Sequence, residues 1–159
     1  MFHTTIGVDP GRVTGWCVAV DHKPVAWGQG ATENSVDAVL DELKGMDEPV
    51  CLFVEAAYQG RFGAGVQVAY RAGLVVGMLR RSLPEGSIVM TAPATQWRKA
   101  LGWSGGKEGR KHAKSQAAKV AFDLTQDKEM RMPTREHVAE AICMAVAAFK
   151  LSADLQNAE

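Results

Sequence analysis

Acidic residues in this sequence come directly after apolar runs, where the ends of buried strands are expected. Asp9 follows one such run, and Glu55 follows the run from Val50 to Val54. A charged carboxylate left unpaired inside a core is costly, whereas the open end of a strand lets it face a cleft. His137 and Glu140 stand three residues apart in an Ala-rich segment, so on a helix they share one face. Carboxylates that converge from separate elements form a hard-oxygen site suited to Mg²⁺ or Mn²⁺.

Length and composition predict one globular domain. The chain has 159 residues, of which 47% are hydrophobic and 23% charged, and its formal net charge is zero. We place the domain at residues 1–150 and a C-terminal tail at 151–159. No run of 18 apolar residues is present, and the N-terminus lacks the pattern of a signal peptide. We therefore expect a cytoplasmic protein that does not enter a membrane.

The cysteines are expected to be reduced, buried thiols. Cys17, Cys51 and Cys143 each lie inside an apolar run. Their odd number and wide spacing argue against a disulfide framework and against a zinc site.

Basic residues are concentrated between residues 91 and 119. This segment holds one acid, Glu108, and seven bases: Arg98, Lys99, Lys107, Arg110, Lys111, Lys114 and Lys119. A local excess of positive charge on a neutral protein is typical of a surface that binds a polyanion. The segment alone is equally well explained as the solvated face of a helix.

Apolar patterning and turn residues predict the order β-β-β-α-β-α-β-α-α-α. We expect strands at 4–9, 14–20, 25–30, 50–54 and 87–91, the second and third joined by a turn at 21–24. Helices are expected at about 34–45, 64–83, 93–101, 111–124 and 134–150. Asn34 or Ser35 is predicted to cap the first helix and Thr134 the last. A glycine-rich loop is predicted between residues 102 and 109. One α/β layer structure, with helices on both faces of a sheet, accommodates this order.

Four motifs in this order resemble those of the RuvC-type Holliday junction resolvases, which have a ribonuclease H-like fold. The motifs are Ile6-Gly7-Val8-Asp9-Pro10-Gly11, Val54-Glu55, Ala113-Lys114-Ser115-Gln116 and His137-Val138-Ala139-Glu140-Ala141. The resemblance implies a mixed five-stranded sheet whose first three strands are antiparallel, with helices on both faces. It also implies a structure-specific endonuclease, of bacterial or phage origin, that cuts four-way DNA junctions.

The resemblance further implies a metal site made of Asp9, Glu55, His137 and Glu140. The family pattern has acids at the last two positions, and here the first of them is His137. Two Mg²⁺ ions, replaceable by Mn²⁺ and about 3.5–4 Å apart, would be bridged by Asp9 and would hydrolyse a phosphodiester. His137 is expected to serve as a metal ligand or as a general base. Glu136 is a rival third carboxylate, because it shares a helix face with Glu140.

The same resemblance implies how DNA would be bound. Phosphate contacts are expected from Arg98, Lys107, Arg110, Lys111 and Lys114. The loop after Glu55 carries further candidates, Tyr58, Arg61 and Phe62. Tyr58 matches a family aromatic that probes the junction centre by stacking on bases, although such a residue could equally close the rim of the core.

A homodimer is implied as well, since a four-way junction calls for two symmetric cuts. The helix expected at 64–83 has apolar and small residues on more than one face, enough for a core and a partner.

Three other functions fit parts of the pattern. A ribonuclease H-like nuclease that acts on other branched DNA or on RNA would use the same metal site. A non-catalytic protein that binds branched DNA could keep the same fold. An actin-like ATPase or sugar kinase shares the form of Asp9, Gly11 and Thr14, but needs two such domains, and 159 residues provide one. We therefore expect no nucleotide cofactor.

Overall fold

The strands form one mixed sheet in the computed structural model, which describes residues 2–56, 64–103 and 105–156. They are β1 (Thr4–Asp9), β2 (Thr14–Val20), β3 (Lys23–Gly30), β4 (Val50–Glu55) and β5 (Ile88–Ala92). Their order across the sheet is β3-β2-β1-β4-β5, with β1, β2 and β3 antiparallel and β4 and β5 parallel to β1. This confirms the predicted mixed sheet and its antiparallel meander.

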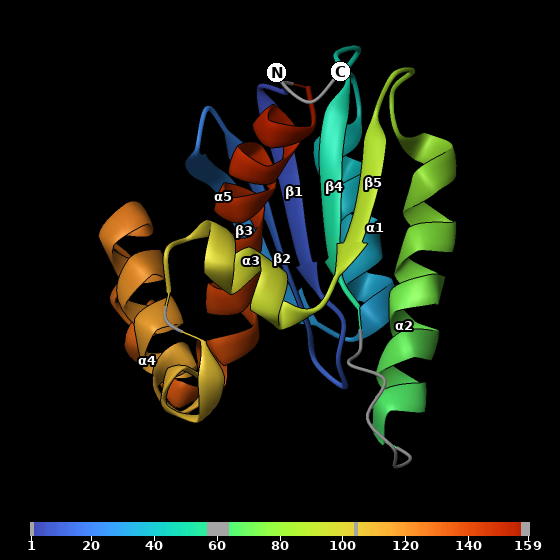
Figure 1. The fold of residues 1–159 in the computed structure, drawn as a ribbon. Helices are drawn as coiled ribbons and strands as arrows, with labels where there is room; N and C mark the ends of the chain where they lie inside the picture. Colours follow the sequence, from blue (N-terminus) through green and yellow to red (C-terminus); the bar gives the residue numbers. More distant parts are fainter. Residues whose placement is uncertain (1, 57–63, 104, 157–159) are drawn as a thin grey trace.

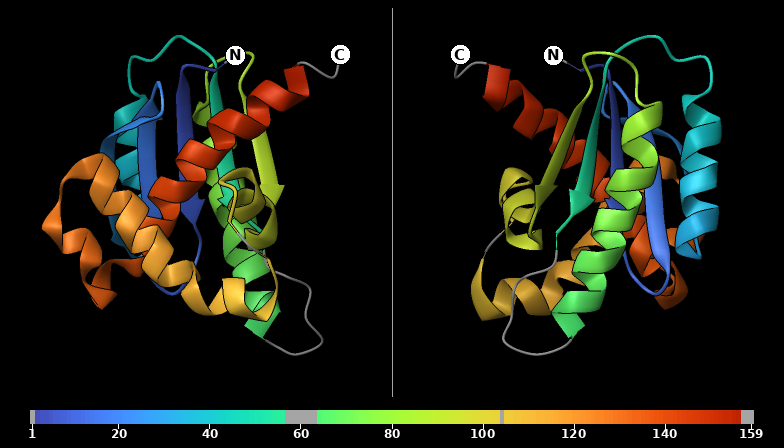
Figure 2. Two further views of the ribbon diagram at one scale, coloured as in Figure 1. Left: turned by 60° about the vertical axis from the view of Figure 1, so that its left-hand side comes forward. Right: turned by 90° about the vertical axis from the view of Figure 1, so that its right-hand side faces the viewer.

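The helices lie on both faces of the sheet, as predicted. Helices α1 (Thr32–Leu43) and α2 (Ala64–Leu79) lie on one side of the sheet, and α2 runs in front of the strands in the right view of Figure 2. The other side holds α3 (Ala94–Ala100), α4 (Gly106–Thr125) and α5 (Glu136–Gln156). Helix α5 crosses the sheet directly over β1 and β2, and α3 and α4 pack against α5 (Figure 1). Short 3₁₀ helices occur at Arg80–Ser82, Lys128–Arg131 and Pro133–Arg135.

Successive side chains of β1 point to opposite faces of the sheet, so this strand faces a different core on each side. Ile6 and Val8 join an aliphatic cluster under α1 and α2, together with Val18, Leu52, Val54, Val36, Val39, Val75 and Leu79. Each of these side chains contributes roughly 1.5–3 kcal/mol when fully buried. Thr5, Gly7 and Asp9 point the other way, toward α5.

Helix α5 lies so close to the sheet that two strand positions must be glycine. A Cβ on Gly7 would lie 2.2 Å from the carbonyl oxygen of Ala141, and one on Gly15 would lie 2.1 Å from that of His137. The hydroxyl of Thr5 also donates a 2.8 Å hydrogen bond to the carbonyl of Ala145. At these two positions the backbone of α5 therefore lies directly against β1 and β2, with no side chain between them.

Three predicted boundaries at the start of the chain are wrong by a few residues. The turn between β2 and β3 is only Asp21–His22, both with positive φ (47° and 68°), so β3 starts earlier than expected. A two-residue hairpin of this kind matches the twist of its strands. Helix α1 begins at Thr32 without a side-chain cap, because its N-cap residue is Ala31. Ser35 lies inside the helix, and its hydroxyl donates to the Thr14 carbonyl at 2.9 Å.

The predicted glycine loop also needs correction. Gly106 and Gly109 are helical, because α4 begins at Gly106 and packs through Ala113, Ala117 and Ala121 against the core. This tertiary packing outweighs the poor helix propensity of glycine.

The ends of α2 and α5 differ from prediction as well. Helix α2 ends at Leu79 rather than at residue 83, and a 3₁₀ turn follows it directly at Arg80–Ser82. Thr134 does not cap α5, since it lies inside the preceding 3₁₀ turn. Helix α5 runs to Gln156 and Ser152 is fully buried, so residues 151–156 continue that helix.

Two further expectations can be compared with the described residues. Cys17, Cys51 and Cys143 are free and buried, as predicted. No helix in the described part of the chain has the length and apolar content needed to span a membrane.

Candidate active site

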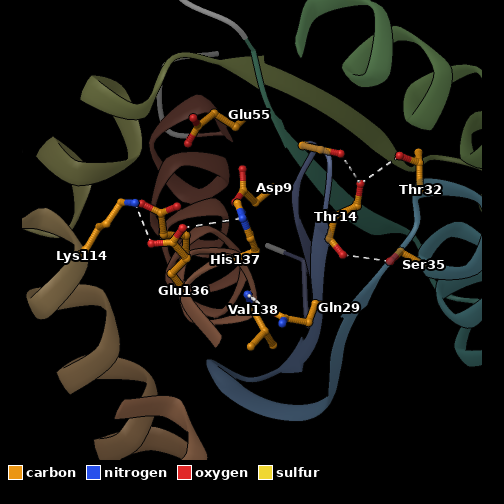
Figure 3. A network of polar contacts seen from close by, with 12 residues as sticks. Asp9, Thr14, Gln29, Thr32, Ser35, Glu55, Lys114, Glu136, His137 and Val138 are labelled. Atoms are coloured by element: carbon orange, nitrogen blue, oxygen red, sulfur yellow. Dashed lines mark hydrogen bonds and ion pairs between the residues drawn. The ribbon is translucent and has the colours of Figure 1, made fainter. Parts of the chain in front are cut away.

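Asp9 and Glu55 end two neighbouring parallel strands and face the same side of the sheet. Asp9 is the last residue of β1 and Glu55 the last of β4, and Val8 pairs with Val54 just before them. Alternation turns both carboxylates toward α5, whose first turns carry His137 and Glu140. Figure 3 shows Asp9, Glu55 and His137 at this place. Asp9 is almost buried, with 8% of its surface exposed.

Three of the four predicted ligands converge closely. The Nδ1 of His137 donates to Oδ2 of Asp9 across 2.7 Å. One ligand atom from each of Asp9, His137 and Glu140 lies within 4.8 Å of the others, which makes this group able to hold a metal ion. Glu55 is not a member of this group, although its carboxylate lies beside Asp9 in Figure 3. The sequence motif therefore brings together a compact triad with a fourth acid next to it.

Burial and mutual repulsion perturb both glutamates. Burial raises the pKa of Glu55 to about 7, the charge of Asp9 adds to this rise, and the hydrogen bond from Trp97 opposes it. Burial likewise raises the pKa of Glu140 to about 7, and the charges of Asp9 and Glu55 add to it. The hydrogen bond to Asp9 raises the pKa of His137. A divalent cation bound among these buried acids would reduce their mutual repulsion.

Arg98 and Lys114 reach the acidic site from α3 and α4. The Nη2 of Arg98 donates to Oε1 of Glu140 at 3.3 Å, and both side chains are mostly buried. The Nζ of Lys114 lies 2.6 Å from Oε2 of Glu136, whose other oxygen lies 3.8 Å from Nε2 of His137. Glu136 is thus paired with a lysine and stands outside the triad, which favours His137 over Glu136 as the candidate ligand.

The other predicted DNA contacts are only partly visible. Lys107 and Lys111 are exposed on α4 and form no ion pair with any described residue. The side chain of Arg110 lies outside the described residues, and so do Tyr58, Arg61 and Phe62.

Sequence reasoning missed one side chain that touches the site and one that contacts the backbone at the start of α5. The indole Nε1 of Trp97, in α3, donates to Oε2 of Glu55 at 2.8 Å. Gln29, in β3, donates to the Thr134 carbonyl at 2.5 Å and accepts from the Val138 backbone N–H at 3.4 Å, which links β3 to the start of α5. Gln29 lies opposite Gly15 in the strand pairing, a relation that local sequence patterns do not reveal.

Comparison with known proteins identifies the fold. No protein-family model matches this chain, and no curated protein matches it in sequence. Among solved structures, RuvC of T. thermophilus in complex with Holliday junction substrate matches with a TM-score of 0.67 and 19% identity, covering 95% of each chain. A second Thermus thermophilus RuvC structure matches with a TM-score of 0.62 and 18% identity, covering 95% of this chain and 96% of that one.

A viral protein extends the comparison. The fowlpox virus resolvase, solved with Holliday junction DNA, matches with a TM-score of 0.54 and 15% identity, covering 94% of this chain and 98% of the other. These matches span nearly the whole of both chains. The chain therefore has the fold of RuvC-type resolvases, within the ribonuclease H-like class, as the motifs indicated.

Proposed function

We propose that this protein is an endonuclease that cuts four-way DNA junctions by divalent-metal-dependent hydrolysis of a phosphodiester. The convergence of Asp9, His137 and Glu140 at one edge of the sheet is the observation that carries this proposal. It is supported by the fold, since two of the similar structures hold Holliday junction DNA.

The donor atoms fit Mg²⁺, with Mn²⁺ as a substitute. Asp9, Glu55 and Glu140 offer carboxylate oxygens, the ligands that hard divalent cations prefer, and His137 offers an imidazole nitrogen. We propose two ions per site, held by these four residues. When bound, such ions supply positive charge that activates a water molecule and stabilises the leaving oxygen.

The residues themselves set the orientation of His137. Asp9 engages Nδ1, so Nε2 is the ring atom left to bind a metal or to accept a proton. The two roles predict different results for His137→Asp. A ligand role is compatible with retained cleavage, because a carboxylate also binds Mg²⁺. A general base role predicts lost cleavage near neutral pH, because an aspartate has a much lower pKa.

We propose that α4 binds the DNA backbone beside this site. Lys107, Lys111 and Lys114 recur at helical spacing, and the first two have no acidic partner among the described residues. Lys114 links this row to the acidic site through Glu136. A row of amines next to metal-binding carboxylates is suited to placing a phosphate over them.

We also propose a homodimer that uses the outer face of α2. Val66 and Tyr70 are 72% and 70% exposed, and a Cβ on Gly73 or Gly77 would meet nothing within 4 Å. These residues follow each other at intervals of three or four, so they form one stripe along the helix. Small residues let a second helix approach closely, and a two-fold dimer would present two sites to a symmetric junction.

Cleavage of a synthetic four-way junction with Mg²⁺ tests the proposal, with duplex, flap and RNA–DNA hybrid of the same sequence as competing substrates. We expect cuts in the junction, none with EDTA, and much less cleavage of the other substrates. Preferred cleavage of the flap or hybrid would instead identify a nuclease for other branched nucleic acids. Tight junction binding without cleavage in Mg²⁺ or Mn²⁺ would identify a non-catalytic binding protein.

We propose that Tyr58 stacks on bases at the junction centre, and this role is tested separately. Tyr58→Ala should weaken junction binding by about 1–3 kcal/mol, with little effect on duplex, because stacking on unpaired bases is lost. Tyr58→Phe keeps the ring and is the matched control. An unchanged ratio of junction to duplex affinity in Tyr58→Ala would contradict the stacking role.

A further inference from the structure

Trp97 is a buried residue with a polar contact to the acidic site. It is 0% exposed, and its ring packs edge-on against Trp103, with ring centroids 5.4 Å apart and an interplanar angle of 70°. An indole has one hydrogen-bond donor and no acceptor, so a buried tryptophan needs an acceptor for its N–H. Here that acceptor is Oε2 of Glu55, at 2.8 Å.

This contact restricts Glu55 more than an exposed hydrogen bond would. The Trp97 ring is enclosed by the core that joins α3, α5 and the sheet, so it cannot swing aside easily. One oxygen of Glu55 is therefore directed at α3 and the other remains available. Glu55 lies outside the group formed by Asp9, His137 and Glu140.

We propose that Trp97 is a positioning residue that holds Glu55 through Oε2, so that Glu55 binds metal through Oε1 alone. The inference rests on the proposed function, because it gives Glu55 a metal to bind. Hydrogen bonds that orient metal ligands typically change metal affinity by about 10–100-fold when they are removed. Trp97 has this geometry, since it donates to the ligand and does not itself reach the triad.

A purely structural role for Trp97 makes a different prediction. Loss of packing would lower the stability of the metal-free protein but leave the affinity of the folded protein for metal unchanged. Trp103 offers a matched comparison, because it packs against Trp97 and no hydrogen bond joins it to a described carboxylate.

The main experiment compares Trp97→Phe with Trp103→Phe by calorimetric titration with Mn²⁺, alongside thermal melting in EDTA. Phenylalanine keeps an aromatic ring at position 97 and removes the N–H. We expect Trp97→Phe to bind Mn²⁺ about 10–100-fold more weakly and Trp103→Phe to bind like wild type, although both melt at lower temperature. Equal Mn²⁺ affinity in folded Trp97→Phe and wild type would overturn the inference, as would equal losses in both variants.

A second measurement on the wild-type chain covers the case in which Trp97→Phe does not fold. The protein is labelled with ¹⁵N-tryptophan, and the Trp97 indole signal is assigned by removing the other tryptophans one at a time. Saturating Mg²⁺ should shift the Trp97 signal, because its acceptor then shares charge with a cation. A Trp97 signal that stays in place at saturation would contradict the inference.

Failure of the proposed function and failure of the role of Trp97 give different experimental results. If wild-type protein binds neither Mn²⁺ nor Mg²⁺ and cuts no junction, the proposed function and this inference both fall. If wild type binds metal and cuts, while Trp97→Phe binds metal equally well, only the role of Trp97 is wrong.

Discussion

The two faces of the sheet are packed in different ways. Under α1 and α2, branched and aliphatic side chains such as Val8, Leu52 and Val39 interdigitate, and each can adjust to a neighbour's change. Under α5, the helix backbone rests on Gly7 and Gly15 with no side chain between. A layer of side chains tolerates small shifts, whereas direct contact between backbones leaves little room for a helix to move.

This contrast shows where a site of this kind can be built. His137 and Glu140 must meet Asp9 at ligand distances, and both stand on the helix whose backbone lies directly against Gly7 and Gly15. The α1–α2 face would hold a ligand less accurately, because its core can repack. The closely packed face supplies the geometry, and the adaptable face supplies most of the aliphatic burial.

Asp9→Asn tests whether the residues on the face under α5 are needed for junction cleavage. Of the changes considered, it is expected to have the largest effect on cleavage. An amide is a poor ligand for Mg²⁺ and cannot hold His137 with a full charge, so we expect no detectable junction cleavage. Junction binding should persist or tighten, because a negative charge near phosphate is removed. The control is Asp37→Asn, at an exposed position of α1, which should cut like wild type. Cleavage within about tenfold of wild type would remove Asp9 from the catalytic site.

Gly15→Ala and Gly28→Ala compare the two faces directly. A Cβ on Gly15 meets the backbone of His137 at 2.1 Å, whereas one on Gly28 meets the Trp16 ring at 2.9 Å, and a side chain can move. We expect Gly15→Ala to lower the free energy of unfolding by about 1–3 kcal/mol or more and to impair cleavage. Gly28→Ala should lose less stability and keep its activity. Urea unfolding and junction cleavage measure the two effects, and equal losses in both variants would contradict the comparison.

The acidic site should make the metal-free protein less stable as pH rises. The pKa values of Glu55 and Glu140 rise from 4.5 to about 7, so the folded state binds protons more tightly than the unfolded state. The resulting stabilisation is fully present below about pH 4.5 and is lost as pH rises through about 7. A pKa that differs by one between the folded and unfolded states corresponds to about 1.4 kcal/mol. His137 has the same sign, because its pKa is raised too.

Thermal melting in EDTA at pH 5 and pH 8 checks this expectation. Each kcal/mol lost should lower Tm by about 2–4 °C, and Mg²⁺ should restore Tm at pH 8 more than at pH 5. The variant Glu55→Gln, Glu140→Gln should show a flatter pH dependence. A metal-free protein whose Tm rises between pH 5 and pH 8 would contradict the raised pKa values of the two glutamates.

The smallest expected effect concerns single lysines on the two sides of the sheet. Lys111→Ala, on α4, should reduce the slope of log affinity for junction DNA against log salt by about one. Lys44→Ala, at the end of α1 and paired with Asp41, should leave the slope unchanged. Equal slopes for both variants and wild type would indicate that the basic segment is a solvated helix face and does not bind DNA.

Strands and the acids at their ends could be predicted because both depend on local patterns. The run before Glu55 is apolar on both faces and the run before Asp9 is apolar on one, so both indicate buried strands, and alternation then directs both carboxylates to one side. The spacing of His137 and Glu140 indicated a shared helix face in the same way. These are short-range relations, and the order of the motifs resembled that of a known family.

The errors fall where a tertiary contact competes with a local preference. Ser35 is a good capping residue, yet its hydroxyl bonds to Thr14 on β2 instead. Gly106 and Gly109 suggested a loop, yet packing of α4 against α5 makes them helical. The hydrogen bond from Trp97 to Glu55 joins residues 42 positions apart, and no pattern in the sequence predicts it.

The bond between Asp9 and His137 joins residues 128 positions apart, near opposite ends of the chain. At about 5–20 residues per second, a ribosome adds His137 roughly 6–25 s after Asp9. Until then the nascent sheet exposes the glycine-lined surface that α5 will cover, and the triad does not exist. A message that ends before residue 136 encodes a chain that lacks α5, and with it His137 and Glu140. Under the proposed function, the protein could therefore cut DNA only after translation has reached α5.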